Sequence, residues 1–157
     1  MSDQTPVTRF KQPTRLSYLV HAGPTTDAFL RHVLEDRLVG RRCPECTKVY
    51  IPPRGACPTC AVPLAEDVPL PDVGVVTTFS VICIPFEGQR LSPPYACAHV
   101  LLDGADVPLL HIVGGCDVDD VHTGMRVRAV WSEDREPTLG RLHYFRPDGP
   151  VGKESDR

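Results

Sequence analysis

The residues best suited to chemistry lie in the stretch RRCPECTKVYIPPRGACPTCAVP, residues 41–63, which holds four of the seven cysteines. They form two Cys-Pro-x-Cys pairs, Cys43/Cys46 and Cys57/Cys60, with ten residues between the pairs. Two such turns about a dozen residues apart have the ligand spacing of a tetrahedral four-cysteine metal site. Each turn brings two sulfur atoms together, and a hairpin between the turns places the second pair opposite the first. The spacing therefore predicts a metal site with these four ligands.

The predicted metal is zinc, and its predicted role is structural, because four thiolates leave no open position for water or substrate. Three alternatives stay open: iron held by the same sulfurs as in rubredoxin, a disulfide, and a site that has lost its metal. A thioredoxin-like redox pair is disfavoured, because it needs a CxxC beside a βαβ pattern, which this sequence lacks. Thr47 and Ala61 follow the two pairs at a position where glycine, which tolerates positive φ, is common. We therefore expect some backbone strain at these two residues.

Basic side chains surround the cysteines. Arg41, Arg42, Lys48 and Arg54 lie between or beside the pairs, and Glu45 is the acidic residue that opposes them. One interpretation is that they offset the charge of −2 that a zinc tetrathiolate carries. The other is a face that binds phosphate, either of nucleic acid or of a cofactor such as coenzyme A. Contact with coenzyme A or with a partner protein is therefore a second predicted role for these four residues.

The segment IPFEGQRLSPPYA, residues 84–96, is unusually apolar for a connection between two predicted strands. A long apolar loop is commonly a binding surface, because a solvated loop has no need of such side chains. We predict that Phe86, Arg90 and Tyr95 contact coenzyme A or a partner. The alternative is that the two aromatic rings close the end of a barrel.

Signatures of an independent enzyme are missing from the sequence. It contains no G-x-S-x-G elbow, phosphate-binding P-loop, strand-following GxGxxG or HExxH motif. We predict no catalytic residues. The remaining cysteines, Cys83, Cys97 and Cys116, lie in or beside predicted strands, where free cysteines are usually small buried side chains.

The elements that would position these residues are mostly strands. A helix is expected over 25–37, capped by Thr25 or Thr26. The segment 66–74, EDVPLPDVG, is interpreted as a linker. Strands are then expected over 74–84, where a bend or bulge is needed, and over 95–103, 107–115, 125–131 and 141–147.

The predicted fold class is therefore mainly β with an N-terminal helix: a rubredoxin-like zinc ribbon followed by a five-stranded OB-fold barrel. The predicted divisions are an arm (1–24), helix plus ribbon (25–66), barrel (67–147) and loose tail (148–157).

Composition restricts where the protein is expected to lie in the cell and what it is expected to bind. No apolar run is long enough to cross a bilayer, and the first ten residues do not resemble a secretory signal. We therefore expect a cytoplasmic protein, in which paired cysteines more often bind metal than form disulfides. Residues 1–66 carry nine basic against six acidic residues, whereas residues 67–157 carry eight against fourteen. An acidic barrel disfavours the alternative function, a zinc-ribbon and OB-fold protein that binds single-stranded nucleic acid.

Three motifs carry a resemblance to a known family: the block RCPxC…PPRxxCPxC, the PPY before the second barrel strand, and GMRVRAVW near the end. Over residues 25–147 the chain resembles the zinc-ribbon plus OB-fold proteins that accompany thiolase-like enzymes. The resemblance implies a non-catalytic accessory subunit that binds and stabilises a thiolase-like partner and helps to hold acyl-CoA. Such a partner would be a thiolase, a hydroxymethylglutaryl-CoA pathway enzyme or a steroid side-chain retro-aldolase. The resemblance also implies that the four paired cysteines bind structural zinc.

Overall fold

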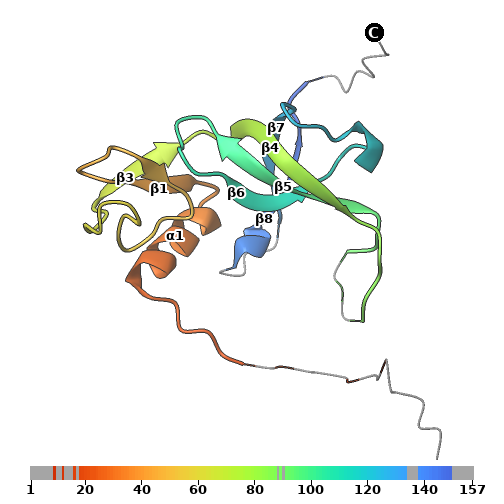
Figure 1. Ribbon diagram of the computed structural model, residues 1–157, viewed down its shortest axis with the longest axis horizontal. Helices are drawn as coiled ribbons and strands as arrows, with labels where there is room; N and C mark the ends of the chain where they lie inside the picture. The colour runs from red at the N-terminus through yellow and green to blue at the C-terminus, as the bar shows by residue number, and fades with distance from the viewer. Residues whose placement is uncertain are drawn as a thin grey trace, which may run out of the picture.

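The fold consists of one helix, a three-stranded sheet and a closed five-stranded barrel. The computed structural model describes residues 9, 12, 16, 18–87, 89, 91–133 and 138–149. The small sheet lies at one end of the molecule with the helix below it, and the barrel lies at the other end (Figure 1). The predicted fold class, mainly β with an N-terminal helix, is confirmed. No helix among these residues is long and apolar enough to span a bilayer.

Helix α1 (Pro24–Leu34) begins one residue earlier than predicted. The predicted caps, Thr25 and Thr26, are wrong, because Gly23 occupies the N-cap and proline the first helical position. Proline suits this position, since its fixed φ is helical and its missing N–H would have had no partner there. The helix also ends before Arg37, the predicted end.

The small sheet is built around its central strand. Strand β1 (Leu38–Arg42) pairs antiparallel with β2 (Val49–Tyr50) on one edge and with β3 (Glu66–Leu70) on the other. The linker predicted over 66–74 is therefore wrong in its first five residues, which form β3, and in its last two, which begin the next strand. We call residues 38–70 the ribbon.

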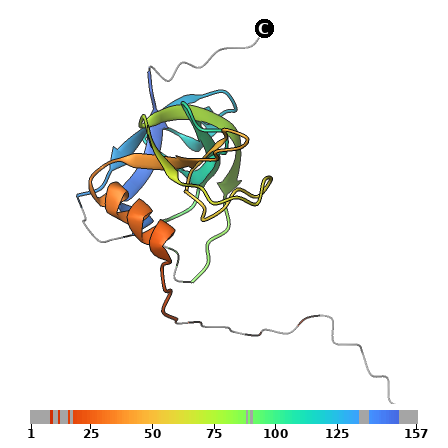
Figure 2. The ribbon, with the colours of Figure 1, turned by 90° about the vertical axis from the view of Figure 1, so that its left-hand side faces the viewer.

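The barrel strands follow the order β4-β5-β6-β8-β7 and close on themselves. Figure 2 shows this closure nearly end on. The five predicted strands are confirmed, with ends displaced by up to two residues, and the predicted irregularity in the first is a register shift between Val76 and Thr78. β6 and β8 run parallel and pair at Val113 and Phe145, whereas the other neighbours are antiparallel. The strands are β4 (Val73–Ile82), β5 (Tyr95–Leu102), β6 (Leu109–Val113), β7 (Arg126–Trp131) and β8 (Leu142–Pro147), with 3-10 turns η1 (Val118–Asp120) and η2 (Leu139–Arg141).

One hydrophobic core joins the helix to the barrel. Phe29 and Val33 of α1 and Leu38 of β1 are buried in the same cluster as the inward-facing barrel residues. Ile51, which follows β2, belongs to this cluster too. The helix and the start of the ribbon are therefore packed onto the barrel.

A hydrogen-bond pair fixes the ribbon to the barrel. Asp106, in the connection between β5 and β6, accepts from the Val49 N–H through its carboxylate at 2.8 Å. Its own N–H donates to the Val49 carbonyl at 2.9 Å. Both polar groups of this β2 residue are thus satisfied by the barrel, which fixes where β2 lies.

A buried arginine ties the end of α1 to the barrel. Arg141 of η2 is 5% exposed and donates to the Asp36 carboxylate at 2.7 Å. Asp36 follows the helix and has a φ of +58°, a conformation that aspartate and asparagine tolerate better than most residues.

Asp36→Asn is expected to lower the free energy of unfolding by about 2 kcal/mol, because it leaves a buried guanidinium without its counter-charge while keeping the backbone preference. Urea unfolding checks this. The control is Asp27→Asn, which removes the exposed i,i+4 pair with Arg31 and should cost less than about 1 kcal/mol. Equal losses in the two variants would contradict the role given to Arg141.

Candidate metal centre

The two cysteine pairs form matching turns, which we call knuckles. In the first, the Cys43 N–H donates to the Lys48 carbonyl at 2.9 Å, and the Thr47 N–H donates to the Cys43 carbonyl at 3.0 Å. The second repeats both bonds, at 2.8 and 2.9 Å, through the equivalent residues Cys57, Val62 and Ala61. Each knuckle thus holds its own two sulfur atoms on the same side of the turn.

The strain expected after each pair is present. Thr47 and Ala61 have φ values of +61° and +57°, in the left-handed region that favours glycine. For a residue with a Cβ atom this conformation costs about 1–2 kcal/mol. The knuckle hydrogen bonds hold both residues there.

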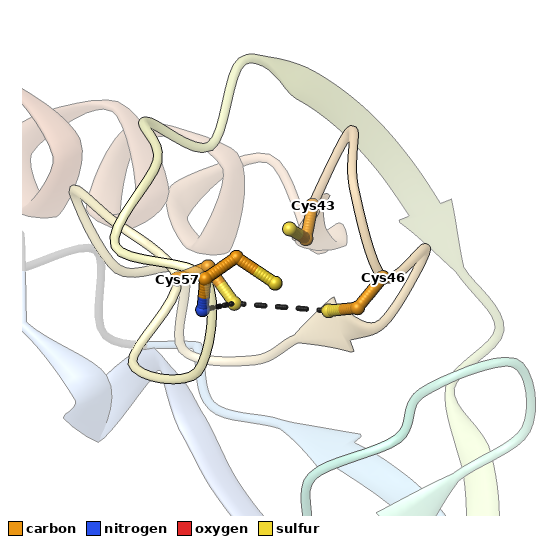
Figure 3. Close-up of side chains that lie close together, drawn as sticks. Cys43, Cys46 and Cys57 are labelled. Atoms are coloured by element: carbon orange, nitrogen blue, oxygen red, sulfur yellow. Dashed lines mark hydrogen bonds between the residues drawn. The ribbon is translucent and has the colours of Figure 1, made fainter.

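The four cysteine sulfur atoms converge. All lie within 4.8 Å of one another, and those of Cys46 and Cys57 are 3.7 Å apart. Figure 3 shows Cys43 and Cys46 pointing from one knuckle toward Cys57 on the other. Cys43 and Cys57 are fully buried, whereas Cys46 and Cys60 are partly exposed.

The surroundings favour a thiolate at Cys57. Its sulfur lies 3.3 Å from the Tyr50 hydroxyl and 3.4 Å from the Cys60 N–H. The hydrogen bond from Tyr50 is the main cause that lowers the pKa of Cys57 to about 6, and it raises the pKa of the tyrosine to about 12. Burial raises the pKa of Cys60 to about 12. Cys60 thus favours the neutral thiol, and a bound cation would stabilise its thiolate form.

This donor set fits a tetrahedral metal ion. With metal–sulfur distances of about 2.3 Å, sulfurs in a zinc tetrahedron lie about 3.8 Å apart, close to the 3.7 Å between Cys46 and Cys57. A zinc ion and a rubredoxin-like iron would both accept four sulfurs. All four positions would be taken by protein, which is the pattern of structural sites.

The predicted basic face is partly neutralised within the ribbon. Arg41 and Arg42 pair with Asp67 and Glu66 of β3, at 2.8 and 3.2 Å. The two remaining predicted contact residues, Lys48 and Arg54, are exposed.

Two arginines of barrel strand β7 are also paired. Arg126 makes two hydrogen bonds to the Asp103 carboxylate at 2.7 and 2.8 Å. Arg128 bonds Asp72 at 2.8 Å and Asp148 at 3.0 Å. These carboxylates compete with nucleic-acid phosphates for the same guanidinium groups.

The apolar loop borders a groove of about 920 Å³. Phe86 and Tyr95 line it, as a binding role for this segment requires, whereas Arg90 lies outside the described residues. Gln89, Leu91 and Ser92 of the same loop also line it, whereas sequence reasoning missed the lining from β6, β8 and the β7–β8 connection. The signal that could have located these residues is the closed OB-fold topology, which places β6, β8 and the β7–β8 connection beside the loop.

The prediction that Cys83 is buried is wrong. Cys83 follows the end of β4 at the start of the loop and is exposed.

Comparisons with known proteins match both parts of the chain. Residues 32–63 match the family model described as the ChsH2 rubredoxin-like zinc ribbon domain, and residues 67–132 match the ChsH2 C-terminal OB-fold domain.

Two curated relatives are named DUF35 domain-containing scaffold proteins. The protein from Methanocaldococcus jannaschii is 34% identical over 108 residues, which cover 68% of this chain and 76% of the relative. The protein from Methanothermobacter thermautotrophicus is 31% identical over 108 residues, covering 68% and 80%.

Solved structures show the same fold. A structure named Ltp2-ChsH2(DUF35) aldolase matches with a TM-score of 0.64 and 25% identity, over 82% of this chain and 98% of the matched chain. A DUF35-family protein of unknown function from Sulfolobus solfataricus matches with a TM-score of 0.57 and 22% identity, over 69% and 78%.

Ala61→Gly is expected to raise the free energy of unfolding by about 0.5 to 1 kcal/mol, because glycine adopts the observed φ without strain. Thermal unfolding in excess zinc checks this. Ala65→Gly is the matched control: Ala65 is exposed and its φ is not positive, so glycine should destabilise there by increasing the entropy of the unfolded chain. The same sign of change in both variants would contradict the strain at Ala61.

Proposed function

Because the chain belongs to the DUF35 family, we propose that it is a non-catalytic accessory subunit that binds a thiolase-like enzyme. In this role it stabilises the partner and helps to hold the acyl-CoA substrate. The family predicted from the cysteine block and barrel motifs is thereby confirmed. Thiolases, hydroxymethylglutaryl-CoA pathway enzymes and steroid side-chain retro-aldolases are the proposed partner classes, and the cytoplasm is the proposed location.

The observation that carries the proposal is the match to the Ltp2-ChsH2(DUF35) aldolase structure. It spans 98% of the matched chain and extends over most of this one. That relative is named as part of an aldolase together with Ltp2. The scaffold name of the curated relatives agrees with a role that supports another protein.

The metal centre supports a structural role. We propose Cys43, Cys46, Cys57 and Cys60 as ligands of zinc, which would be left with no open position for substrate. Lys48 and Arg54, exposed beside the knuckles, are better placed to meet coenzyme A phosphates than Arg41 and Arg42, which pair with β3. Phe86 and Tyr95 are proposed as contacts for the partner or its ligand.

Cys57→Ser is expected to give an aggregating protein with well below one zinc per chain, because metal binding supplies folding free energy that the small ribbon lacks. Inductively coupled plasma mass spectrometry and size-exclusion chromatography check this. Cys83→Ser is the control, since Cys83 is exposed and lies outside the cluster; it should keep full metal. A soluble, fully metallated Cys57→Ser protein would show that the ligands are wrong.

A pull-down of the tagged chain from its native cytosol, followed by mass spectrometry, tests the proposed partner. We expect a thiolase-fold subunit in near-equal amount, and we expect that subunit to be more soluble and more active when the chain is present. Retention of nucleic acid in place of such a subunit would contradict the proposal. So would a partner whose activity and solubility do not depend on this chain.

A further inference from the structure

The groove on the barrel lies on the face that OB-folds commonly use for ligands. It is bounded by the β4–β5 loop, by the β7–β8 connection with η2, and by β6 and β8. In OB-folds the loops after the first and fourth strands, which correspond to these two connections, form part of the usual binding surface. In Figure 1 the β4–β5 loop extends below the barrel, at the end of the molecule away from the ribbon. The groove is as large as sites that take whole small molecules.

The described lining of the groove carries no Asp, Glu, Lys or Arg side chain. Several of its polar groups are already bonded: His111 Nε2 donates to the Leu142 carbonyl at 2.6 Å, and Gln89 Nε2 donates to the Tyr95 hydroxyl at 3.2 Å. Burial lowers the pKa of His111, which keeps its ring neutral. A charged ligand would be desolvated here without a counter-charge. Charge complementarity therefore selects an uncharged, apolar occupant.

The apolar surface continues past the edge of the groove. Phe86, in the β4–β5 loop, and Leu139, in η2, both line the groove and remain 64% and 39% exposed. Ile84, in the same loop but outside the groove, is 80% exposed. A small molecule inside the groove would leave Ile84 in water, whereas a protein surface covers the groove and its edge together. Contiguous exposed apolar side chains of this kind mark interaction sites.

We propose that this groove, edged by Phe86 and Leu139, is where an uncharged apolar segment of the catalytic subunit docks. The inference rests on the proposed function, because it names the surface through which the accessory subunit would act. It assigns partner binding to the barrel and leaves to the ribbon the metal centre and the proposed contacts of Lys48 and Arg54 with coenzyme A.

Aspartate substitutions at the edge of the groove test the proposal. Phe86→Asp and Leu139→Asp should each weaken binding of the purified thiolase-fold subunit at least tenfold in titration calorimetry, because each buries an unpaired charge. The matched control is Leu110→Asp: Leu110 is 58% exposed on β6 but does not line the groove. It should change the dissociation constant by less than about threefold. Thermal unfolding must show all three variants folded.

Photocrosslinking provides a second, independent readout. A benzophenone amino acid at position 86 should crosslink to the catalytic subunit, and one at position 110 should not. Crosslinks to another copy of this chain, or competition by a single-stranded oligonucleotide, would overturn the assignment of the occupant. Unchanged affinity of the Phe86→Asp and Leu139→Asp variants would show that the groove is not the docking site, and the proposed function would still stand. If the wild-type chain retains no thiolase-fold subunit, the proposed function fails and the groove assignment fails with it.

Discussion

The ribbon depends on the close pairing of β1 with both of its neighbours. A Cβ atom at Gly40, in the middle of β1, would lie 2.9 Å from the Tyr50 carbonyl oxygen and 2.9 Å from Val49 Cγ1. Any larger residue would therefore push β2 away, and β2 leads directly from the first knuckle toward the second. On its other edge β1 holds β3, which continues into the barrel. One strand thus fixes the position of the knuckles and the path by which the chain enters the barrel.

The ribbon and the barrel reach stability by different means. The barrel shares a large core with α1, whereas the second cluster of buried residues consists of Cys43, Tyr50, Cys57 and Leu64. Two of these four side chains are candidate metal ligands, so the knuckles have little apolar surface to bury without them. Metal binding can supply folding free energy that so small a core does not. The hydroxyl of Tyr50 supports the candidate metal centre as well, because it forms a hydrogen bond with the Cys57 sulfur.

Local patterns predicted the parts of the fold that depend on local chemistry. The CxxC spacing located the four sulfurs, and β-branched segments located the barrel strands. Strand β3 was missed because Pro69 and its neighbours resemble a linker. The strand forms where β1 offers an edge, and proline is tolerated at the edge of a sheet. Only part of the groove was predicted, for a similar reason. Phe86 belongs to a loop whose apolar composition is visible in the sequence, whereas His111 and Leu139 come to lie beside that loop only when the barrel closes.

The distribution of charge explains why an apolar surface would carry recognition. Arg41 and Arg42 are paired within the ribbon, and Arg126 and Arg128 are paired with carboxylates of the barrel. Paired surface charges contribute little long-range attraction, because each field is cancelled nearby. Exposed pairs of this kind also add little stability, so their clearer effect is to neutralise these four arginines locally. A partner would then be selected by shape and by apolar burial, which depend little on ionic strength and act at contact.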